Sequence, residues 1–278
     1  MIEINNRAYK VFDVHTHAFP DAIAKRAILY LAEKGGVSYF HDGSFGSLSE
    51  YEKKGGADGF LFLPIATKPS QTHSVNEWAV HQALLAQHVG ECVLAFGSLH
   101  PKCENIDEEL DFVVNNGLKG IKLHPEYQEF FVDDEDMFPI YQKIFQRGLI
   151  ISFHAGHDLG FEPPVRGSAK RIAVVCDRFP DARIIAAHMG GFMQYDEVCE
   201  HLAGRENLWL DTSFAAQRME SEEIVNLIRL HGSKRVMFGT DAPWAKFEDS
   251  CQAIINSGLL EEELEDVLYN NASRLLKF

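Results

Sequence analysis

Long apolar runs are missing from this sequence of 278 residues. No stretch approaches the roughly 18 consecutive apolar residues of a membrane-spanning helix. The N-terminal residues also lack the apolar segment of a secretory signal. These absences predict a protein of the cytosol that does not enter a membrane.

Positive charge is scarce as well. Lysine and arginine total 26 against 41 aspartate and glutamate residues, which gives a formal net charge of −15. Nucleic acids and anionic membrane surfaces attract proteins through clustered basic side chains, and the sequence has no basic stretch. The charge therefore argues against nucleic acid and membrane as partners and leaves a small-molecule substrate.

Cysteine is present without a metal-binding or disulfide pattern. The five cysteines are scattered, odd in number and form no C-x-x-C pair: Cys92, Cys103, Cys176, Cys199 and Cys251. Such a set predicts free, mostly structural thiols in a reducing compartment. A cysteine-based zinc site or redox role is therefore disfavoured.

What the sequence does contain is a regular alternation of short apolar runs and helical patterns. Eight runs are typical of strands, at residues 11–14, 59–65, 93–99, 120–123, 149–153, 183–187, 208–212 and 235–240. Helices are expected at 22–33, 75–88, 105–116, 137–147, 168–178, 196–202, 221–231, 249–257 and 259–276, with a loop and a short helix at 37–56.

This alternation gives about 35 residues for each strand and helix, which suits a (β/α)8 barrel. The strands lack polar alternation, as parallel strands covered on both faces do. We therefore predict an α/β protein, a (β/α)8 TIM barrel, with residues 1–278 forming a single domain. A doubly wound open sheet is the alternative, and the absence of G-x-G-x-x-G after the first strand weakens it.

Two histidines follow the first strand. Alternate side chains of an extended backbone point the same way, so His15 and His17 project together. They either hold a metal ion or are hydrogen-bonded surface histidines, and this segment alone does not decide between the two.

Polar residues also follow three later strands. His154 comes after the fifth, His188 after the sixth and Asp241 after the eighth. The C-terminal strand ends of a barrel meet at one face, where active sites lie. A lone strand-end histidine is commonly a loop residue, but this set taken together predicts a metal centre.

Several segments carry a further pattern, and they occur in this order: Asp13-Val-His-Thr-His17, Gly120-Ile-Lys-Leu-His-Pro125, Phe153-His-Ala-Gly156, Ala187-His-Met-Gly-Gly191, Leu210-Asp-Thr-Ser213, Phe238-Gly-Thr-Asp-Ala-Pro-Trp244 and Asn271-Ala-Ser-Arg-Leu-Leu276. Over nearly the whole chain they resemble the amidohydrolase superfamily, specifically the amidohydrolase family 2 branch of metal-dependent barrel hydrolases and decarboxylases. The resemblance implies His15, His17 and His154 as metal ligands. It implies Asp241 as a fourth ligand or proton acceptor and His188 as the catalytic histidine.

The chemistry of these residues supports such roles. Nitrogen ligands with one carboxylate suit Zn²⁺ or a similar divalent ion such as Mn²⁺. Zinc lowers the pKa of bound water to about 7, and Asp241 can take the proton of that water. His188 can polarise a carbonyl or position the water. Asp211, Thr212 or a backbone carbonyl could orient the ligands from behind.

One zinc ion is expected, and Lys122 leaves a second ion open. Some binuclear relatives carry a carboxylated lysine on this strand that bridges two metals. The favoured interpretation of Lys122 is a barrel-interior lysine that pairs with a carboxylate or contacts substrate.

Four residues beyond the strand ends are candidates for the substrate pocket: Phe19, His124, Arg166 and Trp244. The aromatic residues either form an apolar wall or pack the loops. Arg166 could hold a substrate carboxylate through two hydrogen bonds, although a loop salt bridge is the commoner role.

We expect a metal-dependent hydrolase that uses a metal-activated water to break a small C–N or C–O bond, as in an amide, lactam, lactone or ester. The first alternative is a metal-dependent non-oxidative decarboxylase of an aromatic or unsaturated acid. Hydrolysis is preferred because the chain is compact and no arginine stands out as a carboxylate clamp. A catalytically silent metal-binding barrel is the second alternative, disfavoured because Asp241 and His188 are both present. A homodimer is the default assembly.

Overall fold

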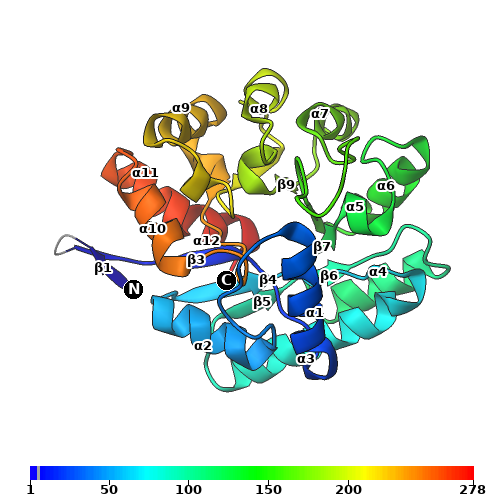
Figure 1. Ribbon diagram of the computed structural model, residues 1–278. Helices are drawn as coiled ribbons and strands as arrows, with labels where there is room; N and C mark the ends of the chain where they lie inside the picture. The colour runs from blue at the N-terminus through cyan, green and yellow to red at the C-terminus, as the bar shows by residue number, and fades with distance from the viewer. Residues whose placement is uncertain (5–6) are drawn as a thin grey trace.

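Parallel strands form the centre of the computed structural model, which describes residues 1–4 and 7–278 (Figure 1). They are β3 (Phe12–Thr16), β4 (Gly59–Phe62), β5 (Val93–Ala95), β6 (Gly97–Ser98), β7 (Gly120–Leu123), β8 (Ile150–Phe153), β9 (Ile184–Ala186), β10 (Leu208–Asp211) and β11 (Val236–Met237). One sheet has the order β11-β10-β9-β8-β7-β6 and the other the order β3-β4-β5.

Backbone contacts join the two sheets. β5 and β6 are parts of one strand interrupted at Phe96, whose N–H donates to Phe62 O at 3.2 Å. On the other side, the N–H of Val14 in β3 donates to Phe238 O, just after β11, at 2.9 Å. The predicted (β/α)8 barrel and its eight strand runs are confirmed in chain order.

The eighth strand is shorter than predicted. β11 covers only Val236–Met237, because the next N–H, that of Phe238, donates to Val267 O at 2.7 Å. The chain then leaves the sheet and returns to β3, where Asp241 N–H donates to His15 O at 2.8 Å. The segment after β11 therefore lies directly beside the first barrel strand.

Helices surround the strands (Figure 1). They are α1 (Asp21–Gly35), α2 (Phe45–Gly55), α3 (Thr72–His88), α4 (Ile106–Asn115), α5 (Pro125–Gln128), α6 (Phe138–Gln146), α7 (Ala169–Arg178), α8 (Tyr195–His201), α9 (Ser221–His231), α10 (Phe247–Ile255), α11 (Glu261–Glu265) and α12 (Asn271–Leu276). Short 3₁₀ segments lie at Pro69–Gln71, Glu135–Met137, His188–Gly190, Ala216–Arg218 and Ser233–Arg235, and a π-helical turn lies at Asp266–Asn270.

One helical region agrees with the prediction of a loop and a short helix, and another differs from the prediction. The region 37–56 contains α2, an 11-residue helix whose start is capped by Ser44, because its side chain accepts the Ser47 N–H at 3.3 Å. The final stretch, expected as one helix, is divided by the π-helical turn between α11 and α12.

An antiparallel pair of strands precedes the barrel and was not predicted. β1 (Ile2–Ile4) pairs with β2 (Arg7–Tyr9). Strands of three residues carry too little alternation to be recognised in sequence.

The barrel strands are buried on both faces, as their continuous apolar pattern predicts. All five residues of β3 and all four of β7 and β8 are buried. One apolar cluster includes Phe12, Leu61, Phe96 and Ile150 from four strands. Within the described residues, no helix combines the length and apolarity needed to cross a membrane.

Candidate metal centre and substrate cavity

A cavity of about 170 Å³ lies at the C-terminal strand ends. Its walls are mostly apolar, with Phe19, Leu63, Phe192, Phe214 and Trp244 among the lining residues. Its ionisable lining residues are His17, Lys122, His124, Tyr127, His154, His157, Asp158, His188 and Asp241. The barrel thus gathers, around one small space, residues that are more than two hundred positions apart.

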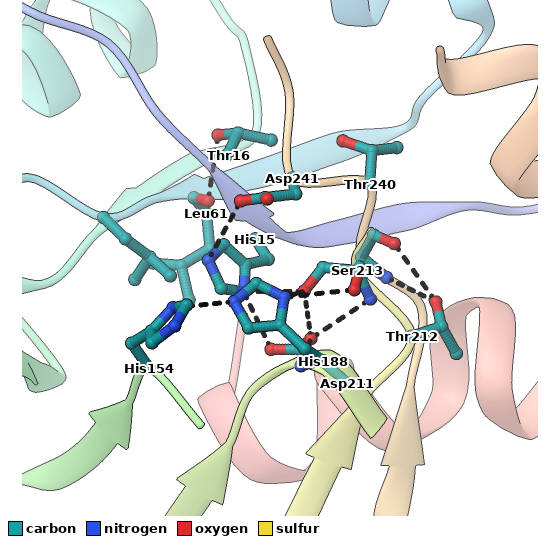
Figure 2. A network of polar contacts seen from close by, with 12 residues as sticks. His15, Thr16, Leu61, His154, His188, Asp211, Thr212, Ser213, Thr240 and Asp241 are labelled. Carbon is teal, nitrogen blue, oxygen red and sulfur yellow. Dashed lines mark hydrogen bonds and ion pairs between the residues drawn. The ribbon is translucent and has the colours of Figure 1, made fainter. Parts of the chain in front are cut away.

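Three side chains converge beside this cavity. His15 Nε2 and His17 Nε2 are 3.2 Å apart. Asp241 Oδ1 lies 3.4 Å from His15 Nε2 and 3.2 Å from His17 Nε2, and Figure 2 shows Asp241 next to His15. Atoms that bind one ion tetrahedrally at 2.0–2.2 Å are roughly 3.3 Å apart. The spacing of these three donor atoms therefore fits a divalent metal ion.

The hydrogen bonds of Nδ1 in His15 and His17 show which nitrogen of each ring carries the proton. His15 Nδ1 lies 2.9 Å from Asp211 Oδ2, and His17 Nδ1 lies 2.8 Å from the carbonyl oxygen of Leu63. Both partners only accept, so each Nδ1 carries the proton and each Nε2 presents a lone pair. Two lone pairs and a carboxylate oxygen therefore face one another, an arrangement that a cation stabilises.

His188 and His154 form a neighbouring pair (Figure 2). His188 Nδ1 lies 3.1 Å from the carbonyl oxygen of Ser213, so His188 Nε2 is the acceptor for His154 Nδ1 at 3.0 Å. His154 Nε2 then carries a lone pair, and it is buried without a hydrogen-bond partner. In the described structure, His154 contacts His188, and no hydrogen bond joins it to His15, His17 or Asp241.

Burial keeps these histidines neutral. Burial and the nearby Lys122 ammonium lower the pKa of His15 to about 3. Burial also lowers the pKa of His154 and that of His188. Neutral imidazole is the form that binds a metal.

Asp241 and Lys122 keep their charges at neutral pH. Burial opposes ionisation of Asp241, but the contact with the His17 ring and the proximity of His15 and His188 outweigh it and hold the pKa of Asp241 below its ordinary value. Burial lowers the pKa of Lys122 to about 8, against the opposing effect of Asp211 and Asp241. Lys122 Nζ lies 3.3 Å from His15 Nε2, so a cation of the protein borders the converging donors.

Asp211 orients both histidine pairs from behind. Its Oδ2 accepts from His15, and its Oδ1 accepts the backbone N–H of His188 at 3.0 Å and that of Ser213 at 3.1 Å. Asp211 and the Leu63 carbonyl are thus the orienting groups. The Thr212 hydroxyl instead donates to the carbonyl oxygen of Gly239 and accepts the Gly239 N–H. Ser213 was not expected, and it donates its hydroxyl proton to Asp211.

The backbone is constrained at this site. Asp13 Oδ1 accepts the N–H of His15 at 2.9 Å and that of Thr240 at 3.1 Å, which ties β3 to the segment of Asp241. Asp241 has a φ of 72° and His188 a φ of 58°. Side chains other than glycine rarely adopt such angles, and residues held there cluster at functional sites.

The four pocket candidates fall into two groups. Phe19, His124 and Trp244 lie on the cavity wall. Arg166 does not line the cavity, and the expectation that it would is wrong. Its guanidinium lies 5.2 Å from the centre of the Phe131 ring, and its backbone N–H donates to Glu126 Oε1. No arginine side chain of the described residues lines this cavity.

Asp158 is a cavity residue that sequence reasoning missed. It follows His154 by four positions in an irregular loop, where no strand or helix period fixes the direction of a side chain. Its Oδ2 lies 3.3 Å from His124 Nε2. The only signal was its place in a polar segment directly after a strand-end histidine.

This fold and donor set define a barrel enzyme whose site can hold a divalent metal. The chain belongs to the amidohydrolase family, because the family's model matches residues 12–278.

The chain is also similar to one curated relative and to several solved structures. The decarboxylase orsB of Emericella nidulans is 34% identical over 38% of this chain and 37% of its own length, so the chain spans little more than a third of that relative. The 5-carboxyvanillate decarboxylase of Novosphingobium aromaticivorans, solved with manganese and a nitrobenzoic acid, is similar at a TM-score of 0.70 and 14% identity, over 99% of this chain and 98% of that one. An uncharacterised barrel protein of Bordetella bronchiseptica is similar at a TM-score of 0.76 and 16% identity, over 96% of this chain and 98% of that one.

These comparisons correct the expected reaction. The sequence favoured hydrolysis. The relative orsB is a decarboxylase, however, and the similar solved structures include a 2,6-dihydroxybenzoate decarboxylase and a 5-carboxyvanillate decarboxylase. The preference rested on chain length and on a missing arginine. Chain length does not determine which bond breaks. The missing arginine does not argue against an acid substrate, because the cavity carries the buried Lys122 cation.

Proposed function

We propose that this protein is a metal-dependent non-oxidative decarboxylase of a small aromatic or unsaturated carboxylic acid. The observation that carries the proposal is the cavity of about 170 Å³, which combines converging metal donors, a lysine cation and mostly apolar walls. An engineered apolar cavity of about 150 Å³ binds benzene, so this space suits one ring. The decarboxylase relatives support the same reaction.

The metal ligands we propose are His15, His17, His154 and Asp241. The first two histidines and Asp241 already have the mutual spacing that one ion needs, and His154 offers a buried Nε2 lone pair. A bound divalent ion would supply positive charge that fixes an acid or hydroxyl oxygen of the substrate. We propose manganese first, because solved neighbours contain it, with zinc as the second choice for this ligand set.

Lys122 is placed to attract the acid. It is buried, it lines the cavity, and it carries an ammonium group beside the metal donors. An ammonium in a site of low polarity pairs with a carboxylate more strongly than it would in water. We propose this role for Lys122 in preference to that of a ligand to a second metal.

Asp241 handles the proton of the reaction. Loss of CO₂ breaks the bond between the ring and the carboxylate, and the electron pair left on the ring carbon must take up one proton. Asp241 is ionised and has no proton to give at the start. It must therefore first accept one, from a substrate hydroxyl or from water, and then pass it to the ring carbon.

His188 acts as a positioning residue in this scheme. Its two ring nitrogens are engaged by the Ser213 carbonyl and by His154. It fixes the orientation of His154.

The test is release of labelled CO₂ from a panel of carboxyl-labelled monocyclic acids by protein loaded with Mn²⁺ or Zn²⁺. We expect CO₂ from at least one acid, lost in Asp241→Asn and retained in the surface variant His88→Gln. Metal-loaded protein that binds these acids and releases no CO₂ from any of them would overturn the proposal.

We also retain as proposals a cytosolic location, suggested by five free cysteines, and a homodimeric assembly. Size-exclusion chromatography with light scattering tests the assembly.

A further inference from the structure

We propose that His124 and Asp158 form a second polar subsite, which accepts a hydrogen bond from a hydroxyl group on the substrate ring. This inference rests on the proposed function and narrows its substrate class to hydroxylated monocyclic acids. It assigns Asp158 as the residue that selects for that hydroxyl.

The two side chains contact each other on the cavity wall. His124 Nε2 lies 3.3 Å from Asp158 Oδ2, and both side chains are largely buried, with 7% and 14% exposed. Asp158 Oδ1 accepts the N–H of Gly160 at 2.8 Å. Burying a carboxylate in a mostly apolar wall is unfavourable unless it is paired. The wall therefore keeps a polar group where an apolar residue would be more stable.

Asp158 can accept further hydrogen bonds. An ionised carboxylate offers about four acceptor positions, and His124 and Gly160 use two of them. Burial opposes ionisation of Asp158, but the partner His124 and the Gly160 N–H hold its pKa below the ordinary value. Asp158 is thus an acceptor without a proton, and it selects for a donor group such as a hydroxyl.

The subsite contains buried atoms without partners. His124 is buried, and its Nδ1 has no hydrogen-bond partner. The nearest carboxylate oxygen, Glu126 Oε2, is 4.0 Å away and also lacks a partner. The local network therefore has unused hydrogen-bonding capacity before any ligand binds.

Aromatic contacts hold the subsite in place. The His124 ring stacks on His154, with centroids 4.2 Å apart and planes 13° apart, and it meets Tyr127 edge-on. Lys34 of α1 lies 3.4 Å from the centre of the Phe161 ring and 4.7 Å from that of Tyr127. Helix α1 thereby fixes the loop that carries Asp158, so the acceptor is in position before a ligand arrives.

A second metal ion is the competing interpretation, because donor atoms of His124, His154 and Asp158 lie within 4.8 Å of one another. The stacking argues against it. Lone pairs of imidazole lie in the ring plane, and stacked, nearly parallel rings confine them to two separate planes, so that one ion does not lie in both planes. A ligand that needs a single acceptor fits this arrangement better.

The experiment measures binding to Mn²⁺-loaded protein by isothermal titration calorimetry. The probes are benzoate, the 2-, 3- and 4-hydroxybenzoates, and the matching fluorobenzoates, which have similar size and no donor. We expect at least one hydroxybenzoate to bind about tenfold or more tightly than its fluoro counterpart. No preference at any ring position would overturn the proposal.

The variant Asp158→Asn reverses the hydrogen-bonding character of this corner. Asparagine retains the acceptor for Gly160 and replaces the other oxygen by a donor. We expect the hydroxyl preference to fall about tenfold while benzoate affinity changes less than threefold. Equal weakening of all probes would show that Asp158 only anchors its loop, and that result would overturn the proposal.

The metal content of the protein distinguishes a hydroxyl subsite from a second metal site. We expect about one Mn²⁺ per chain in both the parent protein and Asp158→Asn, whereas two falling to one would assign the pair to a second metal and overturn the proposal. Binding needs no turnover, so absence of CO₂ from every acid would count against the proposed function and leave the hydroxyl preference measurable.

Discussion

His15 and His231 are both buried histidines, yet only one belongs to a site. Burial lowers the pKa of His15 to about 3 and that of His231 to about 4. His231 Nε2 lies 3.1 Å from the carbonyl oxygen of Leu208, and its Nδ1 has no hydrogen-bond partner. His15 Nε2, by contrast, faces His17 Nε2 and Asp241 Oδ1 at 3.2 and 3.4 Å. Convergence of lone pairs marks the functional histidine, and burial with a shifted pKa does not.

The comparison predicts that the two histidines differ most in metal binding. The double variant His15→Ala/His17→Ala should lower the Mn²⁺ content from about one per chain to below roughly a tenth, because two of the ligands are gone. His231→Gln is the matched control and should keep its metal. Elemental analysis after dialysis measures both, and retention of metal in the double variant would contradict the site.

A second test concerns proton transfer by Asp241, which lies beside His15 and His17. Asp241→Asn should reduce kcat for CO₂ release by roughly 10²–10⁴-fold, the range of a general acid–base group. The assay is run at saturating Mn²⁺, with bound metal quantified alongside, so that loss of chemistry is separated from loss of the ion. A kcat within threefold of the parent value would remove Asp241 from the proton pathway.

A smaller effect on metal binding is expected at Asp211, which holds the ring of His15 in place. Asp211→Asn keeps the shape of the side chain and weakens its hold on the His15 ring, which should reduce Mn²⁺ affinity roughly 10–100-fold. Competition with a fluorescent chelator measures the affinity. Unchanged affinity would show that β3 alone orients His15.

The smallest effect should appear at His231 and only in stability. Its pKa is lowered from 6.5 in the unfolded chain to about 4 in the fold. As pH falls from 7 to 5 the unfolded chain takes up a proton that the folded protein refuses, so the folded state loses about 2 kcal/mol. His231→Gln keeps a donor for Leu208 and should remove that loss. Urea unfolding at both pH values measures it, and the exposed His88→Gln should retain the full loss.

The barrel itself could be predicted because its signals are local. Each buried strand appears as a continuous apolar run, and the strand ends are marked by His15, His154, His188 and Asp241. Once the runs are ordered as a barrel, the topology brings these residues to one face. Contacts between distant residues then follow from the fold alone.

Positions in loops could not be predicted in the same way. Arg166 and Asp158 occupy the same loop after β8, yet Asp158 lines the cavity and Arg166 packs on Phe131. No repeating period sets the direction of a side chain there. The choice between hydrolysis and decarboxylation failed for the same reason, because the cavity walls come from these loops.

The φ of 72° at Asp241 has a consequence for how this protein can change. Glycine adopts such an angle freely, and aspartate does so under strain. Mutational drift under selection for folding alone would favour glycine at position 241. A lineage that lost its need for the reaction would therefore be expected to lose this carboxylate early while the barrel persists.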